Sequence, residues 1–514
     1  MSVKTFAAID VGSFELTMKI FEFSGKNRMR EIDCVSKHLD LGSDTYAQGR
    51  IGNDKMDELC RILKDFADIC RSYRVEAYRA YGTSAIREME NSTVVRDQIK
   101  QRTGISLDIL NNSEQRFLDY KSIASKGESF RKIIEEKTAI LDIGGGSIQI
   151  SLFDNDTLVS TQNLRLGVLR IQEYLNHAGA SRSQMEGLTD EMVTAQLSNY
   201  KKLYLKDREI QNLIIVDDYI TPWAVKRTGN DSAKAVMDAS EFDGYMKLLR
   251  TGGVSQTALS MGIQEEKVPL MFISAILTRR IAELMGAQHI WAPGVTLCDG
   301  IAYEYAEQIG MFHGEHDFEK DIVACALNIS KRYMGSKKRA ETLEKITTAI
   351  FDSMKKIHGM GKRERLYLRL AAILHDCGKY ISMVNTGETA YNIIMSTEII
   401  GLSHVEREIV ASVVRFNHSK FLYDGRQMGT GGLDRAAFLT VAKLTAILRI
   451  STGLDRSHKQ KLKGLRAVLK ENQLILTVDT QEDITLEKSF FEYRKEFFKE
   501  VFSVEPILKQ RKVF

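Results

Sequence analysis

The hydrophobic pattern at the start of the chain predicts a strand, a tight turn and a second strand. Residues 4–10 are largely apolar, which is typical of a strand buried on both faces. Gly12 and Ser13 follow as a turn, and residues 16–23 return with strand character. We therefore expect the chain to open with a β-hairpin.

The same order of features recurs near residue 137. The segment TAILDIGGGSIQISLF repeats FAAIDVGSFELTMKIF as an apolar strand, an aspartate, glycine with serine, and a second strand. An internal repeat of this kind predicts two similar α/β domains with both turns at one cleft. Further patterns predict helices at residues 54–73 and 268–286 and strands at residues 75–82 and 212–218.

Beyond residue 317 the pattern becomes helical. Strand signals return only at residues 473–478, and a final amphipathic helix is predicted at residues 488–502. The chain is thus expected to hold two α/β domains, an all-α region and a small α+β end. We place the predicted domains at residues 1–128, 129–312, 313–456 and 457–514.

The composition is that of an ordinary soluble protein, with 43% hydrophobic and 27% charged residues. No uninterrupted apolar run reaches the ~18 residues needed to span a bilayer, and no secretory signal pattern opens the chain. The formal net charge of +4 is too small to indicate nucleic-acid binding. The 6 cysteines are scattered without a CxxC pair, so we expect a cytoplasmic protein with no membrane partner.

The two glycine–serine turns carry the clearest chemical signal. Glycine lets the backbone approach an anion closely and point N–H groups at it, and serine adds a hydroxyl donor. An aspartate at a strand end can hold Mg²⁺ or a water beside a phosphate. A guanidinium group at the start of the helix after residues 83–84 can clamp phosphate through two hydrogen bonds. The predicted phosphate-binding residues are Gly12, Ser13, Arg87, Gly144, Gly145, Gly146 and Ser147, and the predicted metal ligands are Asp10 and Asp142.

Together these motifs resemble the exopolyphosphatase and guanosine pentaphosphate phosphohydrolase family. The matching segments are AAIDVGS, YGTSAIREMEN, SEQRFLDY, LDIGGGS and LRLGVLRI, of which GTSAIR and DIGGGS at their spacing are the most specific. The segments RERLYLRLAAILHDCGK and VFSVEPILKQ fit longer members of the family. The resemblance therefore covers nearly the whole chain.

The resemblance implies an α/β fold in which two actin-like, sugar-kinase-type (ribonuclease H-like) domains flank a cleft. An all-α HD-like domain and a small α+β C-terminal domain would follow them. It implies Mg²⁺-dependent hydrolysis of phosphoric anhydrides, with release of terminal phosphate from inorganic polyphosphate or guanosine pentaphosphate. It also implies a homodimer. From the small net charge, we expect no specific nucleic-acid partner.

The chain departs from this family at its catalytic carboxylates. Relatives read like S-G-x-E-E-A-x-L at residues 111–118, and the second glutamate acts as base or positions water. That slot falls on Gln115, while Glu114 matches the neighbouring carboxylate and would supply the base if the register shifted by one residue. The second turn usually continues S-T-E, but here the third position is Gln149. An amide neither accepts a proton at neutral pH nor supplies charge to Mg²⁺, and losing a general base costs about 10²–10⁴ in rate.

Two further departures add negative charge beside the expected phosphate site. Glu15 follows the first turn, where relatives read D-x-G-S-N-S, and Asp217 lies where relatives carry a small glycine-rich turn. Each would place a carboxylate near a polyanion, which Coulomb repulsion disfavours unless a cation intervenes.

The HD-like segment keeps only part of its metal-binding set. Such a site needs a distant histidine, an adjacent His-Asp pair and a later aspartate. His375 and Asp376 supply the pair, but the first position holds Arg339 and the last holds Thr452. Two ligands hold a metal poorly, so we expect His375 and Asp376 to be a structural pair, which His418 could join.

Two functional hypotheses follow from the residues. In the first, the chain is a phosphohydrolase in which Asp142 holds Mg²⁺, the two turns and Arg87 clamp phosphate, and Glu114 orients water. In the second, the chain keeps the cleft as a non-hydrolytic sensor or regulator that binds polyphosphate or nucleotide. Gln115 and Gln149 separate the two hypotheses, and the sequence does not distinguish polyphosphate from a guanosine nucleotide.

Overall fold

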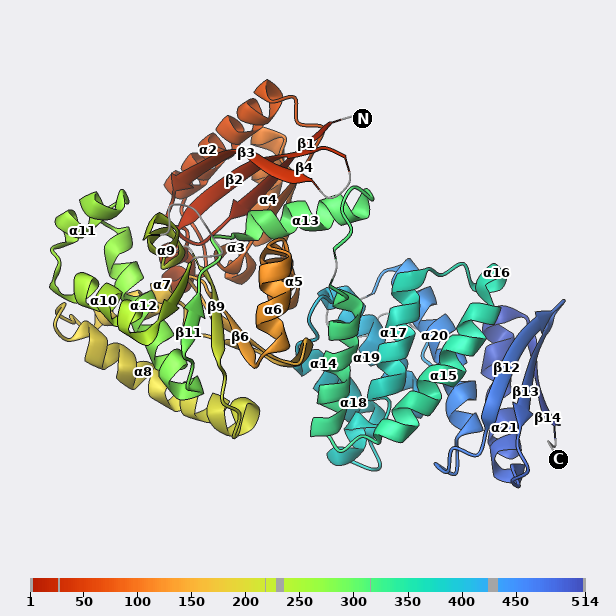
Figure 1. Cartoon of the computed structure of the whole chain (residues 1–514). Coiled ribbons are helices and arrows are strands. Elements are labelled where there is room, and N and C mark those ends of the chain that lie inside the picture. The colour runs from red at the N-terminus through yellow and green to blue at the C-terminus, as the bar shows by residue number, and fades with distance from the viewer. Residues whose placement is uncertain are drawn as a thin grey trace. The chain divides into compact units, whose positions relative to one another are not determined.

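A computed structural model of the chain describes residues 3–25, 28–217, 219–227, 235–314, 316–423 and 433–511. The chain divides into two compact units, residues 1–318 and 319–514. The first unit holds two mixed sheets with helices on their faces, and the second is mainly helical (Figure 1). Each unit is described by itself below.

The first sheet of the first unit has the strand order β3-β2-β1-β4-β5. β1, β2 and β3 are antiparallel neighbours, whereas β4 and β5 run parallel to β1. The strands are β1 (Lys4–Val11), β2 (Glu15–Phe23), β3 (Met29–His38), β4 (Ala77–Gly82) and β5 (Leu107–Ile109). The hairpin predicted from the first hydrophobic runs is therefore confirmed.

Helices cover both faces of this sheet, which explains why β1 is apolar almost throughout. Successive side chains of a strand point to opposite faces. Ala7 and Ile9 pack with α2 and α4 on one face, while Phe6 and Ala8 pack with α5 and α13 on the other. The helices of this half are α1 (Gly42–Gln48), α2 (Asn53–Ser72), α3 (Ser84–Glu88), α4 (Ser92–Thr103), α5 (Asn112–Ala124), α6 (Glu128–Glu135) and α13 (Leu297–Gln308).

The second sheet repeats the topology of the first. Its order is β10-β11-β9-β6-β7-β8, in which β6, β7 and β8 are antiparallel neighbours and β9 and β11 continue parallel. β8-β7-β6-β9-β11 thus corresponds to β3-β2-β1-β4-β5, and the predicted internal duplication is confirmed. The strands are β6 (Thr138–Ile143), β7 (Ile148–Asp154), β8 (Thr157–Leu164), β9 (Asn212–Asp217), β10 (Val236–Asp238) and β11 (His289–Trp291).

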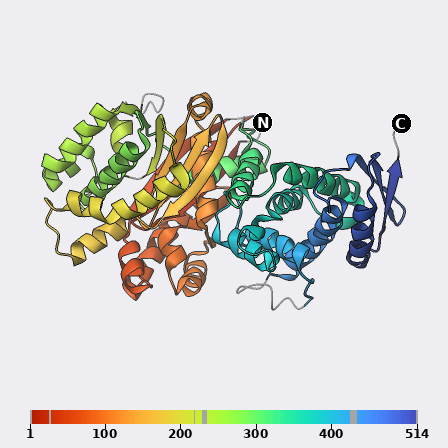
Figure 2. The same cartoon turned by 90° about the horizontal axis from the view of Figure 1, so that it is seen from below.

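The second sheet is buried against helices that follow it in the chain. A single core joins β6, β7 and β9 to α7, α8, α10 and α12, and Figure 2 shows these helices, yellow to green, beside the strands. The helices are α7 (Val168–His177), α8 (Met185–Tyr200), η1 (Lys201–Leu205), α9 (Thr221–Arg227), α10 (Ala239–Thr251), α11 (Val254–Met261) and α12 (Lys267–Met285).

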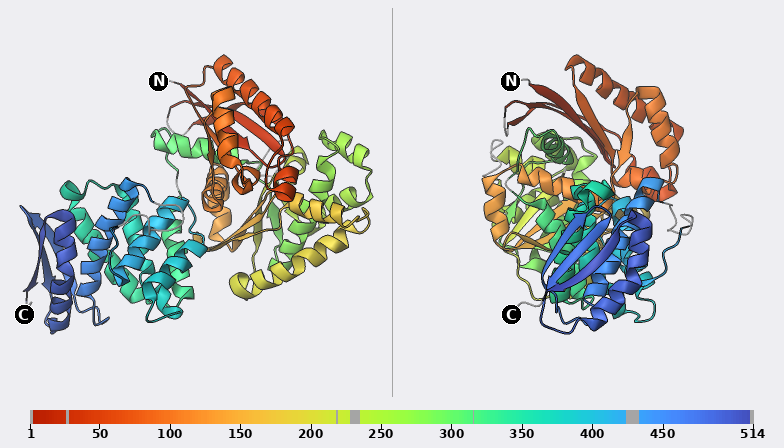
Figure 3. Two further views of the ribbon diagram at one scale, coloured as in Figure 1. Left: turned by 180° about the vertical axis from the view of Figure 1, so that it is seen from behind. Right: turned by 90° about the vertical axis from the view of Figure 1, so that its right-hand side faces the viewer.

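The second unit is a helical bundle with a small sheet at its C-terminal end. Its helices are α14 (Phe318–Arg332), α15 (Lys337–Ser353), α16 (Lys355–His358), α17 (Lys362–Leu374), η3 (Cys377–Tyr380), α18 (Thr386–Ser396), α19 (His404–His418), α20 (Arg435–Leu454) and α21 (Thr485–Phe502). The strands β12 (Lys463–Lys470), β13 (Gln473–Asp479) and β14 (Glu505–Arg511) form a sheet in this order, with α21 packed against it (Figure 3).

One helix of the second unit has the length and apolar composition of a membrane span. It is α20, and 72% of its most apolar window is buried inside the structure. Buried side chains at nearly every position from Leu444 to Leu454 account for its composition. The apolar character of α20 is thus that of a core helix.

Candidate functional site

The two glycine–serine turns of the first unit line one pocket. The turn between β1 and β2 contributes Gly12 and Ser13, and the turn between β6 and β7 contributes Gly144, Gly145 and Ser147. The pocket encloses about 810 Å³ of space not filled by atoms, open solvent included. A Cβ atom placed on Gly145 would lie 2.9 Å from the Cβ of Ser13, so the two turns touch each other.

The backbone shows which positions of the two turns correspond. The N–H of Gly12 donates to the carbonyl of Glu15 at 3.1 Å, and the N–H of Gly144 donates to the carbonyl of Ser147 at 3.0 Å. The two turns are therefore closed by the same bond, and Glu15 takes the place that Ser147 has in the second turn.

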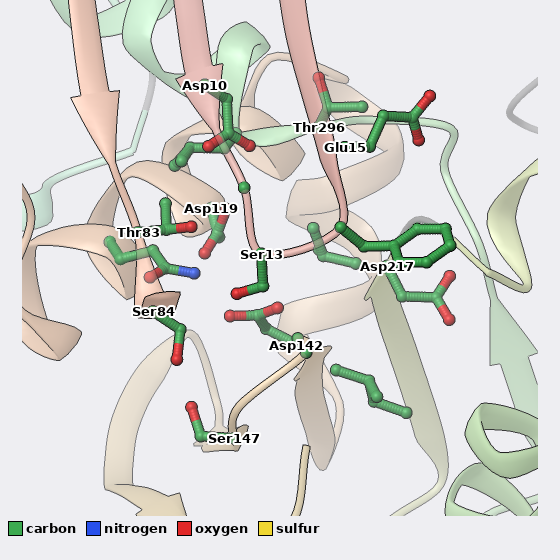
Figure 4. A pocket seen from close by; sticks show the side chains of 18 of the residues that line it. Asp10, Ser13, Glu15, Thr83, Ser84, Asp119, Asp142, Ser147, Asp217 and Thr296 are labelled. Atoms are coloured by element: carbon green, nitrogen blue, oxygen red, sulfur yellow. The ribbon is translucent and has the colours of Figure 1, made fainter. Parts of the chain in front are cut away.

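Three aspartates surround the space between the turns. Asp10 lies near the C-terminal end of β1, Asp142 near the C-terminal end of β6, and Asp119 on α5. All three line the pocket (Figure 4). In the same view the carboxyl group of Asp142 and the hydroxyl group of Ser13 point toward one another. Asp119 was not among the predicted site residues, although it follows Gln115 by one helical turn and so shares its face of α5.

Gln149 is held between Asp142 and a buried arginine. Its Nε2 donates to Oδ2 of Asp142 at 2.8 Å, and its Oε1 accepts from Nε of Arg116 at 2.9 Å. Arg116 also donates to the hydroxyl group of Thr161, which lies 3.0 Å from that of Ser151. The amide at this position is therefore built into a hydrogen-bonded chain, in which Arg116 stands where the family pattern has alanine.

Gln115 and Glu114 have different surroundings although they are adjacent. Gln115 lines the pocket, and its Oε1 accepts from Arg87 at 3.3 Å, while the same guanidinium donates to the carbonyl of Leu110 at 2.7 Å. Glu114 is not among the pocket residues. Its carboxylate accepts from the N–H of Asn111 at 3.1 Å and completes a capping box at the start of α5.

A tyrosine connects the first turn to the start of α3. The hydroxyl oxygen of Tyr46 lies 2.9 Å from that of Ser13 and 3.0 Å from that of Ser84. Burial raises the pKa of Tyr46, so it remains a neutral hydroxyl group. Arg170 lies over its ring, with the guanidinium carbon 4.7 Å from the centroid, and pairs with Glu88 at 2.7 Å.

This network also explains the third glycine of the second turn. Arg170 donates to the carbonyl of Gly146 at 3.2 Å. A Cβ atom on Gly146 would lie only 2.2 Å from the hydroxyl of Ser84 and 2.5 Å from that of Tyr46. A side chain at residue 146 would therefore force the hydroxyl groups of Ser84 and Tyr46 to move and would disturb their contact with each other.

The two extra carboxylates expected near the phosphate site are both accounted for. Glu15 and Lys267 both line the pocket and form an ion pair at 2.9 Å, so the charge of Glu15 is neutralised. Asp217 accepts from the N–H groups of Ile220 and Thr221 at the start of α9 and from the hydroxyl of Ser274. Burial raises the pKa of Asp217.

The second unit brings the residues predicted to be a remnant of an HD-type metal site together around an arginine. Arg339 donates to Asp376 at 2.5 Å and pairs with Asp455 at 3.4 Å, while His375 lies 3.0 Å from Asp376. Burial alone would raise the pKa of Asp376, but the hydrogen bond from His375 and the charge of Arg339 hold it well below its usual range. His418 donates to the carbonyl of His375 at 2.6 Å, and burial lowers the pKa of His418 to about 4.

No group of three histidine, cysteine, aspartate or glutamate side chains in the described part of the chain has the geometry of a metal site. In the second unit the guanidinium group of Arg339 lies between two carboxylates, where a cation is electrostatically favoured. Thr452, at the position where an HD-type site has its late aspartate, accepts a hydrogen bond from Arg494 at 2.5 Å, so this position also faces an arginine.

Comparisons with known proteins agree with this architecture. A family model described as the Ppx/GppA phosphatase family matches residues 24–308, and one described as Ppx/GppA phosphatase, domain III, matches residues 324–493. Guanosine-5'-triphosphate,3'-diphosphate pyrophosphatase of Photobacterium profundum is 21% identical over 492 residues, covering 92% of this chain and 91% of that protein. Exopolyphosphatase 1 of Mycobacterium bovis is 27% identical over 184 residues, covering 35% and 52% respectively.

Solved structures show the same fold at low sequence identity. An exopolyphosphatase from Cytophaga hutchinsonii superposes with a TM-score of 0.50 at 17% identity, covering 60% of this chain and 100% of that chain. The two duplicated sheets of the first unit are accordingly an actin-like pair.

Proposed function

Because the chain belongs to the Ppx/GppA phosphatase family, we propose that its first unit releases terminal phosphate from inorganic polyphosphate or guanosine pentaphosphate. The observation that carries this proposal is the meeting of the two glycine–serine turns, with three aspartates, at one pocket. The proposal is also supported by the similarity of the chain to a guanosine-5'-triphosphate,3'-diphosphate pyrophosphatase from Photobacterium and an exopolyphosphatase from Mycobacterium.

In the proposed site the protein supplies mainly position and charge, as phosphoryl transfer requires. The backbone N–H groups of the two turns and the hydroxyl groups of Ser13 and Ser147 bind the terminal phosphate. Arg87, oriented by Gln115 and the carbonyl of Leu110, binds a phosphate oxygen. Tyr46 holds Ser13 in place.

Magnesium is the cofactor that this function implies, and the pocket residues fit it. Mg²⁺ usually keeps several waters and is bound by one or two carboxylates together with substrate phosphates. Asp10 and Asp142 offer such carboxylates. With Glu15 paired to Lys267, the remaining lining is acidic, so a phosphate polyanion is favoured there only with a cation. Bound Mg²⁺ would neutralise charge on the phosphate oxygens.

We assign the orientation of the attacking water to Asp119 in this proposal. Gln115 cannot act as a base, and Glu114 is engaged at the start of α5. Asp119 lines the pocket, is 3% exposed and lies one turn after Gln115. Its carboxylate would take a proton from water as the water oxygen bonds to the terminal phosphorus. The bond from that phosphorus to the bridging oxygen breaks, and the shortened chain leaves with the electron pair.

A specific observation favours the second candidate, a non-hydrolytic sensor. Gln115 and Gln149 do more than replace carboxylates, because each amide oxygen accepts a hydrogen bond from an arginine, Arg87 and Arg116 respectively. An amide network that orders the pocket without adding charge suits a protein that binds phosphate and does not cleave it.

Phosphate release from polyphosphate and from guanosine pentaphosphate with Mg²⁺ separates the two candidates. If the chain is a hydrolase, the wild-type protein should release phosphate, and Asp119→Asn should lower kcat by about 10²–10⁴. Asp97→Asn, at an exposed position of α4, is the matched control and should retain the wild-type rate. Unchanged turnover in Asp119→Asn would remove Asp119 from the mechanism.

A sensor is expected to bind without turnover, and activity should appear only when the family carboxylates return. The structure adds a requirement to that test: in Gln115→Glu with Gln149→Glu, Arg116 would form an ion pair with the new glutamate. The informative comparison is therefore this double variant with and without Arg116→Ala. Turnover by the wild type would exclude the sensor.

We further propose that the second unit is an HD-type domain without a metal centre. The adjacent pair His375 and Asp376 and the position of Arg339 support this proposal. The guanidinium of Arg339 then takes the electrostatic role that a metal ion has in such a domain. Its function would be structural or in substrate binding.

A further inference from the structure

A second cavity adjoins the pocket between the two turns. It encloses about 710 Å³ of space not filled by atoms, open solvent included. Two residues, Arg87 and Ser147, line both cavities, so the two are direct neighbours. Its lining consists of Arg87, Glu88, Asn112, Ser147, Asn163 and Arg165.

The charge of this second cavity is opposite to that of the first. Arg165 has a side chain that is 74% exposed, and its ion-pair contact is with Glu88 at 4.0 Å. Glu88 pairs more closely with Arg170, at 2.7 Å, and accepts from the hydroxyl group of Ser84 at 3.3 Å. Because Arg170 already neutralises Glu88, the charge of Arg165 is left for a ligand.

Two side-chain amides in this cavity have unmet hydrogen-bonding capacity. The Oδ1 atoms of Asn112, at the start of α5, and Asn163, in β8, are buried and have no hydrogen-bond partner in the described part of the protein. A buried amide without a partner is costly, and a ligand or water usually satisfies it. Each amide can turn by 180°, so it can present its Nδ2 donors to a phosphate oxygen.

We propose that this cavity is a second anion subsite, which binds the next phosphate group of a linear phosphate chain. The inference rests on the proposed function, since it requires the terminal phosphate to bind between the two turns. The described lining contains no aromatic ring on which a nucleobase would stack, whereas arginine and amide groups suit phosphate oxygens. Arg165 is then a residue that determines preference for a phosphate chain over single phosphate.

The test compares binding of orthophosphate, pyrophosphate and tripolyphosphate to the full chain by calorimetry, with Mg²⁺ present. The wild type should bind the two chain phosphates more tightly than orthophosphate. Arg165→Gln should weaken both about tenfold and leave orthophosphate unchanged, as expected when one charge-assisted contact is lost. Arg61→Gln, at an exposed position of α2, is the matched control. Unchanged orthophosphate binding also shows that the Arg165→Gln protein is folded.

Three outcomes would overturn the subsite, and they differ in what else they remove. Equal affinity of Arg165→Gln and wild type for pyrophosphate removes the subsite and leaves the proposed function intact. Failure of the wild type to bind any of the three phosphates removes both. Tighter binding of guanosine triphosphate than of tripolyphosphate, unaffected by Arg165→Gln, would show that a nucleobase is recognised instead.

Discussion

The pocket of the first unit and the arginine cluster of the second place carboxylates in two different electrostatic settings. In the first unit, residues 115 and 149 are amides where the family resemblance implies carboxylates, and each accepts a hydrogen bond from an arginine. In the second unit, Arg339 itself lies between Asp376 and Asp455. The first arrangement leaves an open pocket, and the second fills the space with a side chain.

The electrostatic balance explains the difference. Asp10, Asp119 and Asp142 line the pocket, where the proposed function requires a cation that arrives with substrate. Asp376 instead has His375, Lys379 and Arg339 as close partners. A fixed guanidinium stabilises buried carboxylates permanently, but it leaves no exchangeable position. An acidic lining that is open, as in the pocket of the first unit, therefore indicates a cation-binding site better than the number of retained motif residues does.

The largest expected effect follows from removing the guanidinium group of Arg339 from the cluster of the second unit. Arg339→Ala should lower the free energy of unfolding by about 3–5 kcal/mol, because it leaves the buried carboxylate of Asp455 without its cation. Oδ2 of Asp455 is buried and has no hydrogen-bond partner in the described part of the protein, so its charge is balanced by the ion pair with Arg339 at 3.4 Å. Denaturant titration measures the effect, with Lys338→Ala, the exposed neighbour on α15, as control. A loss below about 1 kcal/mol would contradict the assigned role of Arg339.

A second, smaller effect concerns the pH dependence of stability near the same cluster. The pKa of His418 is lowered from 6.5 to about 4, so the unfolded chain takes up a proton before the folded one does. Stability from this group is therefore complete above pH ~6.5 and is lost as the pH falls toward 4, by about 2 kcal/mol between pH 7 and 5.

His418→Gln should reduce that pH dependence, because the amide can still donate to the carbonyl of His375 without titrating. Unfolding titrations at pH 7, 6 and 5 measure the difference between variant and wild type. His404→Gln, at an exposed position of the same helix, provides the comparison. Identical slopes for His418→Gln and wild type would show that His418 is already accessible to protons in the folded state.

The smallest expected effect concerns the hydroxyl group of Tyr46 in the first unit. Tyr46→Phe removes the hydroxyl group between Ser13 and Ser84 and should cost about 1 kcal/mol, or about fivefold in phosphate affinity. Calorimetry with pyrophosphate and Mg²⁺ measures it, and Tyr174→Phe, at a 56% exposed position, is the control. Equal affinity in Tyr46→Phe would mean that Ser13 needs no such support.

The repeated hairpins could be predicted because their signal is local and strong. Apolar strands on both sides of a glycine–serine turn occur twice, and both sheets are built around them. β3 was not predicted, since it is a half-exposed edge strand whose polar positions follow no clear alternation. The spacing from Asn111 to Glu114 is a capping-box pattern and indicates the structural role of Glu114, whereas the hydrolase hypothesis from the sequence had Glu114 orient water.

By itself, the sequence determined the duplicated α/β hairpins and the glycine-rich turns, because each follows from residue type and short-range spacing. The resemblance to the family added the expectation of carboxylates at residues 115 and 149, and only the tertiary structure decided what the amides there contact. Gln149 and Arg116 are separated by 33 positions, and Arg339 and Asp455 meet only when two helices pack. Hydrogen bonds and ion pairs act over a few ångströms in space, and distance along the chain carries little information about them.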